Sequence, residues 1–86
     1  MDWQVYVLHC GDDSFYTGIA KDVSRRLDQH VRGKGARYTR GRGPLVLWWQ
    51  SEAMSHAQAL SLERRIKTMS RAQKKGLKAQ KEDAVD

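Results

Sequence analysis

The sequence is poor in cysteine and has no long apolar run. A single cysteine, Cys10, excludes an internal disulfide framework, so we expect a protein of the reducing cytoplasm. No apolar segment approaches ~18 residues, and the start of the chain has no charged-then-apolar pattern. These absences argue against a membrane span and a secretory leader. With 40% hydrophobic and 30% charged residues, the composition also excludes a disordered chain.

The length limits the kind of site that the protein can build. A chain of 86 residues is one domain at most. A folded chain of this size buries only about 60–65% of its unfolded surface and has a radius of gyration of about 12 Å. No deep cleft fits between two lobes, so we expect a shallow, open site that suits a large substrate.

Positive charge is concentrated in the middle of the sequence. The net charge is +6, and residues 21–50 alone carry +6, against −3 for residues 1–20. Residues 32–42, called the basic loop below, are too rich in glycine for a regular helix and can follow a phosphate backbone. The candidate nucleic-acid contacts in the basic loop are Arg32, Lys34, Arg37, Tyr38, Arg40 and Arg42. The alternative is a solvated loop that only keeps the protein soluble.

Two apolar segments near the start of the chain are typical of β-strands. Residues 3–9 and 15–19 are rich in β-branched and aromatic side chains, and residues 11–14 between them have turn chemistry. An antiparallel hairpin is therefore predicted. Asp22 can cap a helix whose apolar residues recur at every fourth position: Val23, Leu27 and Val31.

The second half of the sequence predicts one more strand and two more helices. Residues 45–49 are strongly apolar, and the basic loop before them has room for one helical turn over residues 36–39. Capping boxes at residues 55–58 and 70–73 begin two helices. The order ββα(α)βαα predicts an α+β fold with a three-stranded antiparallel sheet flanked by helices. We expect residues 1–78 to form the domain and residues 79–86 a frayed polar tail.

Tyr6 and Tyr16 are the first candidates for chemistry, because both lie in the predicted hairpin. A tyrosine in a strand is most often a packing residue, and that alternative stays open here. Gly18 lies two residues after Tyr16. A glycine near the end of a short strand indicates either a bulge or the close approach of another backbone.

Three further polar side chains fall on or beside apolar helix faces. Arg26 and His30 are four residues apart and share a face, whereas Arg25 points about 100° away. Such a pair could bind and protonate a phosphate, or belong to a solvated helix face. Glu63 lies within about 60° of the centre of the next helix's apolar stripe. A carboxylate there must pair with an arginine or bind a metal. The residues of that stripe are Ala59, Leu62, Ile66 and Met69.

The order of these residues resembles that of the GIY-YIG nuclease superfamily. Val5-Tyr6-Val7 and Tyr16-Thr17-Gly18 resemble its paired strand motifs, and Arg26, His30 and Glu63 follow in the order of its active site. The segments GKGARYTRGRGP and IKTMSRAQKKGL are similar to small stand-alone bacterial members of uncharacterised role. The resemblance runs from Trp3 to Leu77, nearly the whole chain.

The resemblance implies a role for each matching residue. Tyr6 and Tyr16 would line the catalytic face, and one of them would help to activate the attacking water. Arg26 would bind the scissile phosphate, and His30 would assist proton transfer. Glu63 would hold a single divalent cation, Mg²⁺ or Mn²⁺, and no small-molecule cofactor is implied. The implied activity is hydrolysis of phosphodiester bonds by an endonuclease, and the implied partner is nucleic acid, DNA in preference to RNA.

Some positions differ from the superfamily pattern. Thr17 replaces an isoleucine, and Ile19 stands where some members have a lysine. The chain contains no asparagine and no appended DNA-binding domain. We therefore expect low sequence specificity and a structured or damaged DNA substrate, as in DNA repair. A catalytically inactive nucleic-acid-binding module is the alternative. A domain this small could also dimerise to cut two strands, with Trp48-Trp49 as an apolar surface, unless these tryptophans pack in the core.

Overall fold

The central strand of the protein is β1 (Gln4–His9), which pairs antiparallel with both other strands. The sheet order is β2-β1-β3, with β2 (Phe15–Ala20) and β3 (Val46–Gln50) at the edges. The structure is a computed structural model that describes the backbone of residues 1–85 and the side chains of residues 1–78. The predicted hairpin and three-stranded antiparallel sheet are confirmed.

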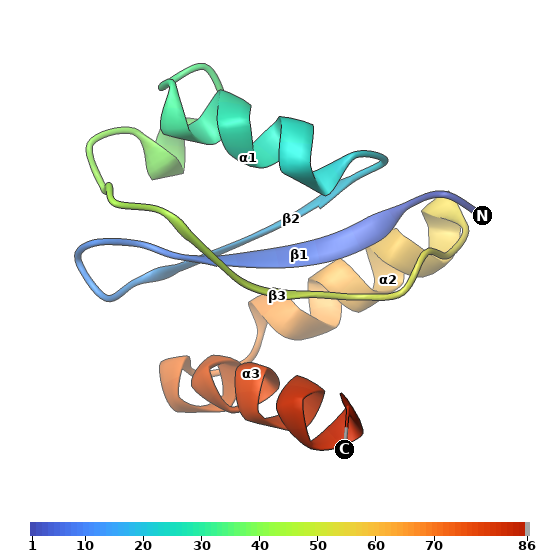
Figure 1. Ribbon diagram of the computed structural model, residues 1–86. Helices are drawn as coiled ribbons and strands as arrows, with labels where there is room; N and C mark the ends of the chain where they lie inside the picture. Colours follow the sequence, from blue (N-terminus) through green and yellow to red (C-terminus); the bar gives the residue numbers. More distant parts are fainter. Residues whose placement is uncertain (86) are drawn as a thin grey trace.

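Three α-helices and one 3-10 turn complete the fold (Figure 1). The order is β1, β2, α1 (Val23–Val31), η1 (Arg37–Thr39), β3, α2 (His56–Lys67) and α3 (Arg71–Val85). This is the predicted ββα(α)βαα order, in which η1 is the expected turn within the basic loop. The predicted tail includes Asp86, which lies outside the described residues, and the division of the chain at residue 78 stays a prediction.

The helices begin where the capping residues predict. Asp22 accepts a hydrogen bond from the backbone N–H of Arg25 at 3.0 Å. The side chain of Ser55 and the backbone N–H of Gln58 are 3.1 Å apart, and the reciprocal bond from Ser55 N–H to Gln58 is also 3.1 Å. The same pair of bonds joins Ser70 and Gln73 before α3. These local contacts satisfy amides that a helix start leaves unpaired.

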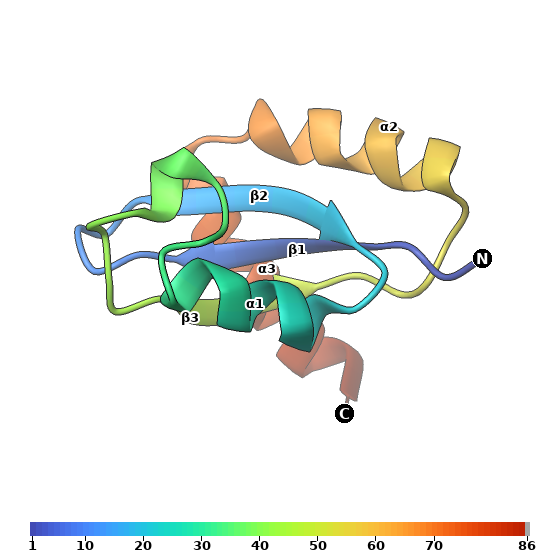
Figure 2. The same cartoon turned by 90° about the horizontal axis from the view of Figure 1, so that it is seen from above.

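The sheet separates two apolar clusters. In Figure 1, α1 covers one face of the sheet, and α2 and α3 cover the other. Figure 2 shows α2 running alongside β2, which it contacts more than it contacts β1. The buried residues on the α1 face are Tyr6, Leu8, Ala20 and Val23. Those on the opposite face are Val5, Val7, Phe15, Ala59, Ile66 and Leu77. The Cα radius of gyration is 12.4 Å, close to the expected value.

The predicted apolar stripe of α1 is wrong at its last residue. Val31 is 61% exposed, whereas the neighbouring His30 is only 1% exposed. The helix therefore turns an imidazole, and not the valine, toward the sheet. His30 is hydrogen-bonded on both ring nitrogens, which offsets the cost of burying it.

An irregularity in β3 places both tryptophans on the same side of the sheet. The register between β1 and β3 shifts after Val7, which pairs with Trp49, while Leu8 pairs with Leu47. Trp48 is the extra residue, and both tryptophans pack against the cluster beneath α2 and α3. Core packing is confirmed for both, and dimerisation stays a prediction. No helix of the described residues is long and apolar enough to cross a bilayer.

Thr17, one of the residues that depart from the superfamily pattern, has an unsatisfied hydroxyl. It is 3% exposed, and its Oγ1 has no hydrogen-bond partner among the described residues. Because an unpaired buried hydroxyl is costly, we expect Thr17→Val to raise the free energy of unfolding by about 1 kcal/mol. Urea denaturation measures this, with Thr68→Val as the control, since Thr68 donates to the carbonyl of Arg65. A loss of stability in Thr17→Val would contradict the assignment.

Candidate functional site

The hairpin brings Tyr6 and Tyr16 together on the α1 face of the sheet. Their ring centroids are 6.3 Å apart. Tyr6 pairs with Gly18 across the two strands, and its ring lies over that glycine. A Cβ on Gly18 would stand 2.6 Å from Tyr6 Oη, closer than real contacts allow. The sequence predicted either a bulge or the close approach of another backbone at Gly18, but the group that approaches is the phenol of Tyr6.

Helix α1 adds Arg26 and His30 to the two tyrosines. His30 Nε2 lies 2.8 Å from Tyr6 Oη, in a buried contact. The centroid of the His30 ring is 5.1 Å from that of Tyr16, so the three rings form one group. Arg26 is half-buried, and its Nη1 donates to Gln29 at 2.9 Å. The adjacent Arg25 is exposed, as its different direction on the helix predicts.

Burial and several neighbouring charges shift the pKa of the Tyr6 hydroxyl. Burial raises the pKa of Tyr6 to about 12, and the charge of Tyr16 raises it further. The guanidinium of Arg26 lowers the pKa, both by hydrogen bonding and by charge, and the charge of Glu63 raises it. Arg26 from α1 and Glu63 from α2 therefore act on the same phenol. The rings of Tyr6, Tyr16 and His30 form one group. The charges of Arg26 and Glu63 act on Tyr6, so the structure relates all five sequence-predicted residues of the site, from four elements, to one phenol.

The raised pKa of Tyr6 predicts a late step in the alkaline titration. Phenolate absorbance should show one of the three tyrosines ionising at about pH 12. Since folding favours the neutral phenol, the stabilisation is complete below pH ~10 and is lost as the pH rises toward 12. Tyr6→Phe should remove this late step, and Tyr38→Phe should keep it. Loss of an early step in Tyr6→Phe would contradict the assignment.

Glu63 is the carboxylate that could hold a metal. Its side chain is 16% exposed, and Oε2 lies 3.5 Å from Lys67 Nζ on the next turn of α2. Among the described residues, no three His, Cys, Asp or Glu side chains gather around one point. A cage made only of protein ligands is therefore not formed there. Mg²⁺ is commonly bound through one or two carboxylates, with water and substrate phosphate completing the shell. Glu63 fits that kind of site.

The basic loop contacts Tyr16 through Tyr38. The ring centroid of Tyr38 is 5.9 Å from that of Tyr16, and Tyr38 is 40% exposed. The guanidinium of Arg42 lies 4.2 Å from the centre of the Tyr38 ring and pairs with Asp12. Arg32 is exposed and pairs with Asp28. The other three basic residues of the loop are exposed: Lys34, Arg37 and Arg40.

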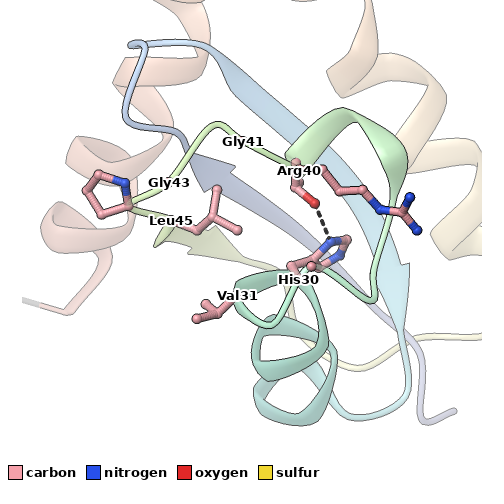
Figure 3. A pocket seen from close by; sticks show the side chains of 9 residues that line it. His30, Val31, Arg40, Gly41, Gly43 and Leu45 are labelled. Carbon is pink, nitrogen blue, oxygen red and sulfur yellow. Dashed lines mark hydrogen bonds between the residues drawn. The ribbon is translucent and has the colours of Figure 1, made fainter.

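The sequence did not predict the residues that hydrogen-bond to Nδ1 of His30. Its Nδ1 lies 3.0 Å from Thr39 Oγ1 and 3.2 Å from the backbone N of Ala36. His30 and Thr39 both line a cavity of about 130 Å³, and Figure 3 shows His30 there. A Cβ on Gly35 would stand 2.3 Å from His30 Nδ1. The glycine-rich pattern indicated a loop, but it carried no signal for this contact.

Comparison with known proteins gives one consistent result. A family model described as the GIY-YIG catalytic domain matches residues 2–77. The UPF0213 protein SG0387 of Sodalis glossinidius (strain morsitans) is 47% identical over 83 residues, which are 96% of this chain and 78% of that protein. A UPF0213 protein of Halobacterium salinarum is 48% identical over 73 residues, or 85% of this chain and 95% of that protein.

Solved structures give the same result. The solution NMR structure of the UPF0213 protein BH0048 from Bacillus halodurans matches with a TM-score of 0.59 and 44% identity. The match covers 94% of this chain and 86% of that one. The solution NMR structure of the protein EF2693 from E. faecalis matches with a TM-score of 0.60 and 32% identity, over 96% of this chain and 86% of that one.

Proposed function

Because the chain belongs to the GIY-YIG family of nuclease catalytic domains, and to its UPF0213 group, we propose that it is a divalent-metal-dependent endonuclease acting on DNA. The substrate is structured or damaged DNA, cut with low sequence specificity. One observation carries the proposal: the Tyr6 hydroxyl is hydrogen-bonded to His30, and the charges of Arg26 and Glu63 shift its pKa. A phenol (Tyr6), a cation (Arg26) and a carboxylate (Glu63) that interact in this way are suited to phosphodiester hydrolysis.

Arg26 is the group that binds the scissile phosphate. A guanidinium stays charged at every relevant pH and presents paired donors that match phosphate oxygens. Half-burial beside the sheet reduces screening by water, so its attraction for developing negative charge exceeds that of a fully exposed arginine. The bond from Arg26 to Gln29 holds the guanidinium in place before substrate arrives.

The general base is Tyr6 or His30. A phenol with a pKa of about 12 lies ~5 units above neutral pH, which corresponds to about 7 kcal/mol for its ionisation at pH 7. This pKa already includes the lowering by Arg26, so the remaining stabilisation must come from another group. A divalent cation at Glu63, when bound, polarises the phosphate and lowers the pKa of bound water. The base then needs to be only moderately strong.

The basic loop holds the DNA backbone across the shallow face. Lys34, Arg37 and Arg40 are exposed and available to phosphates, whereas the exposed Arg32 pairs with Asp28. The ring of Tyr38 lies beside that of Tyr16. Phosphate contacts of this kind fix the position of a duplex without reading its sequence. Low sequence specificity follows from that.

A cleavage assay tests the proposal. We expect purified protein to nick supercoiled plasmid and cut branched DNA with Mg²⁺ or Mn²⁺, and to do neither with EDTA. Activity that persists in EDTA would contradict the metal dependence. No cleavage of plasmid, branched or damaged DNA with either metal would contradict the enzymatic function.

A catalytically inactive nucleic-acid-binding module is the second candidate. The observation in its favour is that burial raises the pKa of Tyr6 and so opposes formation of a phenolate base. With about five phosphate contacts, such a module should bind DNA with a log-affinity that falls against log salt at a slope near −4.5. Its binding would be independent of metal and unchanged in Glu63→Gln.

A further inference from the structure

The imidazole of His30 has a protein partner on each nitrogen. Nε2 faces Tyr6 Oη at 2.8 Å, and Nδ1 faces both the Ala36 backbone N at 3.2 Å and Thr39 Oγ1 at 3.0 Å. The ring is 1% exposed. Figure 3 shows His30 turned toward the loop that follows α1. No ring nitrogen is left for a water molecule or a substrate atom.

The partners on the loop side determine where the imidazole proton lies. A backbone N–H can only donate, so Nδ1 must accept from Ala36 and carries no proton. The Thr39 hydroxyl then donates to Nδ1 as well. The Ala36 carbonyl does not need that hydroxyl, because it already accepts from the Thr39 backbone N–H at 3.2 Å.

The opposite tautomer leaves a group unsatisfied. With a proton on Nδ1, the imidazole would donate to Thr39 Oγ1, and Thr39 would donate to the Ala36 carbonyl at 2.9 Å. The Ala36 N–H would then face another N–H with no acceptor, which is costly in a half-buried place. The arrangement with the proton on Nε2 satisfies every group on the loop side of the ring.

Gly35 makes this arrangement possible. A Cβ there would meet His30 Nδ1 at 2.3 Å and Cγ at 2.7 Å. A side chain at residue 35 would force the loop away from the ring and separate both donors from Nδ1. By contrast, a Cβ on Gly43 of the same connection meets nothing within 4 Å.

We propose that Gly35, Ala36 and Thr39 lock His30 as the neutral Nε2–H tautomer, so that His30 donates a hydrogen bond to Tyr6 Oη and does not take the proton of Tyr6. His30 is then a positioning residue, and Thr39 and Gly35 position it in turn. A donor on the phenolic oxygen favours the phenolate. Burial and the charge of Arg26 lower the pKa of His30, in agreement with a neutral ring.

This inference rests on the proposed function and deepens it by removing His30 from the candidate bases. It differs from the proton-transfer role that the family resemblance implies for His30. The tautomer itself does not depend on activity, so it is measured on the protein whether or not DNA is cut.

Long-range ¹H–¹⁵N correlation of the histidine rings in the full chain tests the tautomer. The three histidines are assigned with His9→Gln and His56→Gln, which each remove one other ring. We expect His30 to show a protonated Nε2 and an unprotonated Nδ1 at neutral pH. A proton on Nδ1, alone or in an imidazolium, would overturn the proposal.

Variants of the loop test the lock. Thr39→Val should increase the exchange rate of the Nε2 proton about tenfold, the effect of one lost hydrogen bond, and Thr39→Ser should restore the wild-type rate. Gly35→Ala should mix the tautomers, whereas Gly43→Ala should not. In an active enzyme Thr39→Val should lower kcat about tenfold at unchanged KM. A wild-type tautomer and exchange rate in both Thr39→Val and Gly35→Ala would overturn the lock.

The ring measurements separate the two proposals. An Nε2–H tautomer in a protein that cuts no DNA supports the lock and contradicts the endonuclease. An Nδ1–H tautomer in an active enzyme contradicts the lock and leaves the endonuclease supported.

Discussion

Arg26→Ala will slow DNA cleavage by about 100-fold or more, and the same substitution at Arg25 will leave the rate within about twofold. The two arginines are adjacent, but they point in different directions on α1. Arg26 is half-buried and acts on the Tyr6 hydroxyl, whereas Arg25 is exposed. Removal of Arg26 takes away the cation that meets the developing charge on the phosphate.

The rate of conversion of supercoiled to nicked plasmid measures this difference. The two variants lose the same charge, so a general loss of DNA attraction affects both equally. Circular dichroism and thermal unfolding establish that both are folded. Equal rates for Arg25→Ala and Arg26→Ala would contradict the phosphate-binding role of Arg26.

Glu63→Gln will reduce metal-dependent cleavage by about 100-fold or more, since it replaces the anionic metal ligand with a neutral side chain of the same shape. The ion pair with Lys67 is a single pair one turn apart on α2, and its loss costs little stability. The Glu63→Gln variant should therefore lose activity while it stays folded. Raising Mn²⁺ should recover part of the rate if the remaining amide still coordinates weakly.

Glu52→Gln is the matched control for this change. Glu52 is exposed and lies between β3 and α2, in none of the contacts that surround Tyr6. It should cleave at the wild-type rate with the wild-type metal dependence. A Glu63→Gln variant that keeps the wild-type rate at low Mg²⁺ would contradict the assignment of Glu63 as the metal ligand.

Local patterns in the sequence predict much of the fold. The turn after β1, the cap at Asp22 and the two capping boxes act over three or four residues, so they can be found without tertiary information. The burial of His30 in place of Val31 could not be found this way. A helical wheel favours the valine, and the partners that make imidazole burial possible come from β1 and from the basic loop.

The candidate site, like the fold, could be predicted from the sequence only in part. The order of motifs predicted Tyr6, Tyr16, Arg26, His30 and Glu63, and in the structure the other four contact Tyr6 or act on it through their charge. The contacts of Gly18 and Gly35 were not predictable, because each depends on a ring from another element crossing a strand or a loop. Thr39 is nine residues from His30, and only the fold of the basic loop brings its hydroxyl to the ring.

The distribution of charge also gains a structural meaning. Tyr6 and Tyr16 come from the acidic first part of the chain, while Arg26 and the basic loop come from the strongly basic middle. Asp12 and Asp13 at the hairpin turn pair with Arg42 and Arg71, which ties the turn to the basic loop and to α3. Tyr38 of the basic loop lies beside Tyr16, so part of this positive segment borders the candidate site.

The central claim is that Arg26 of α1 and Glu63 of α2 serve one metal-dependent cleavage site. The most direct test is the plasmid-nicking rate of wild type, the two single variants and the double variant Arg26→Ala/Glu63→Gln. Groups that act as a unit are strongly non-additive. We predict nicking by wild type with Mg²⁺, a large loss in each single variant, and a double variant no slower than the slower single one. Losses that multiply in the double variant, or single variants as active as wild type, would contradict a shared site.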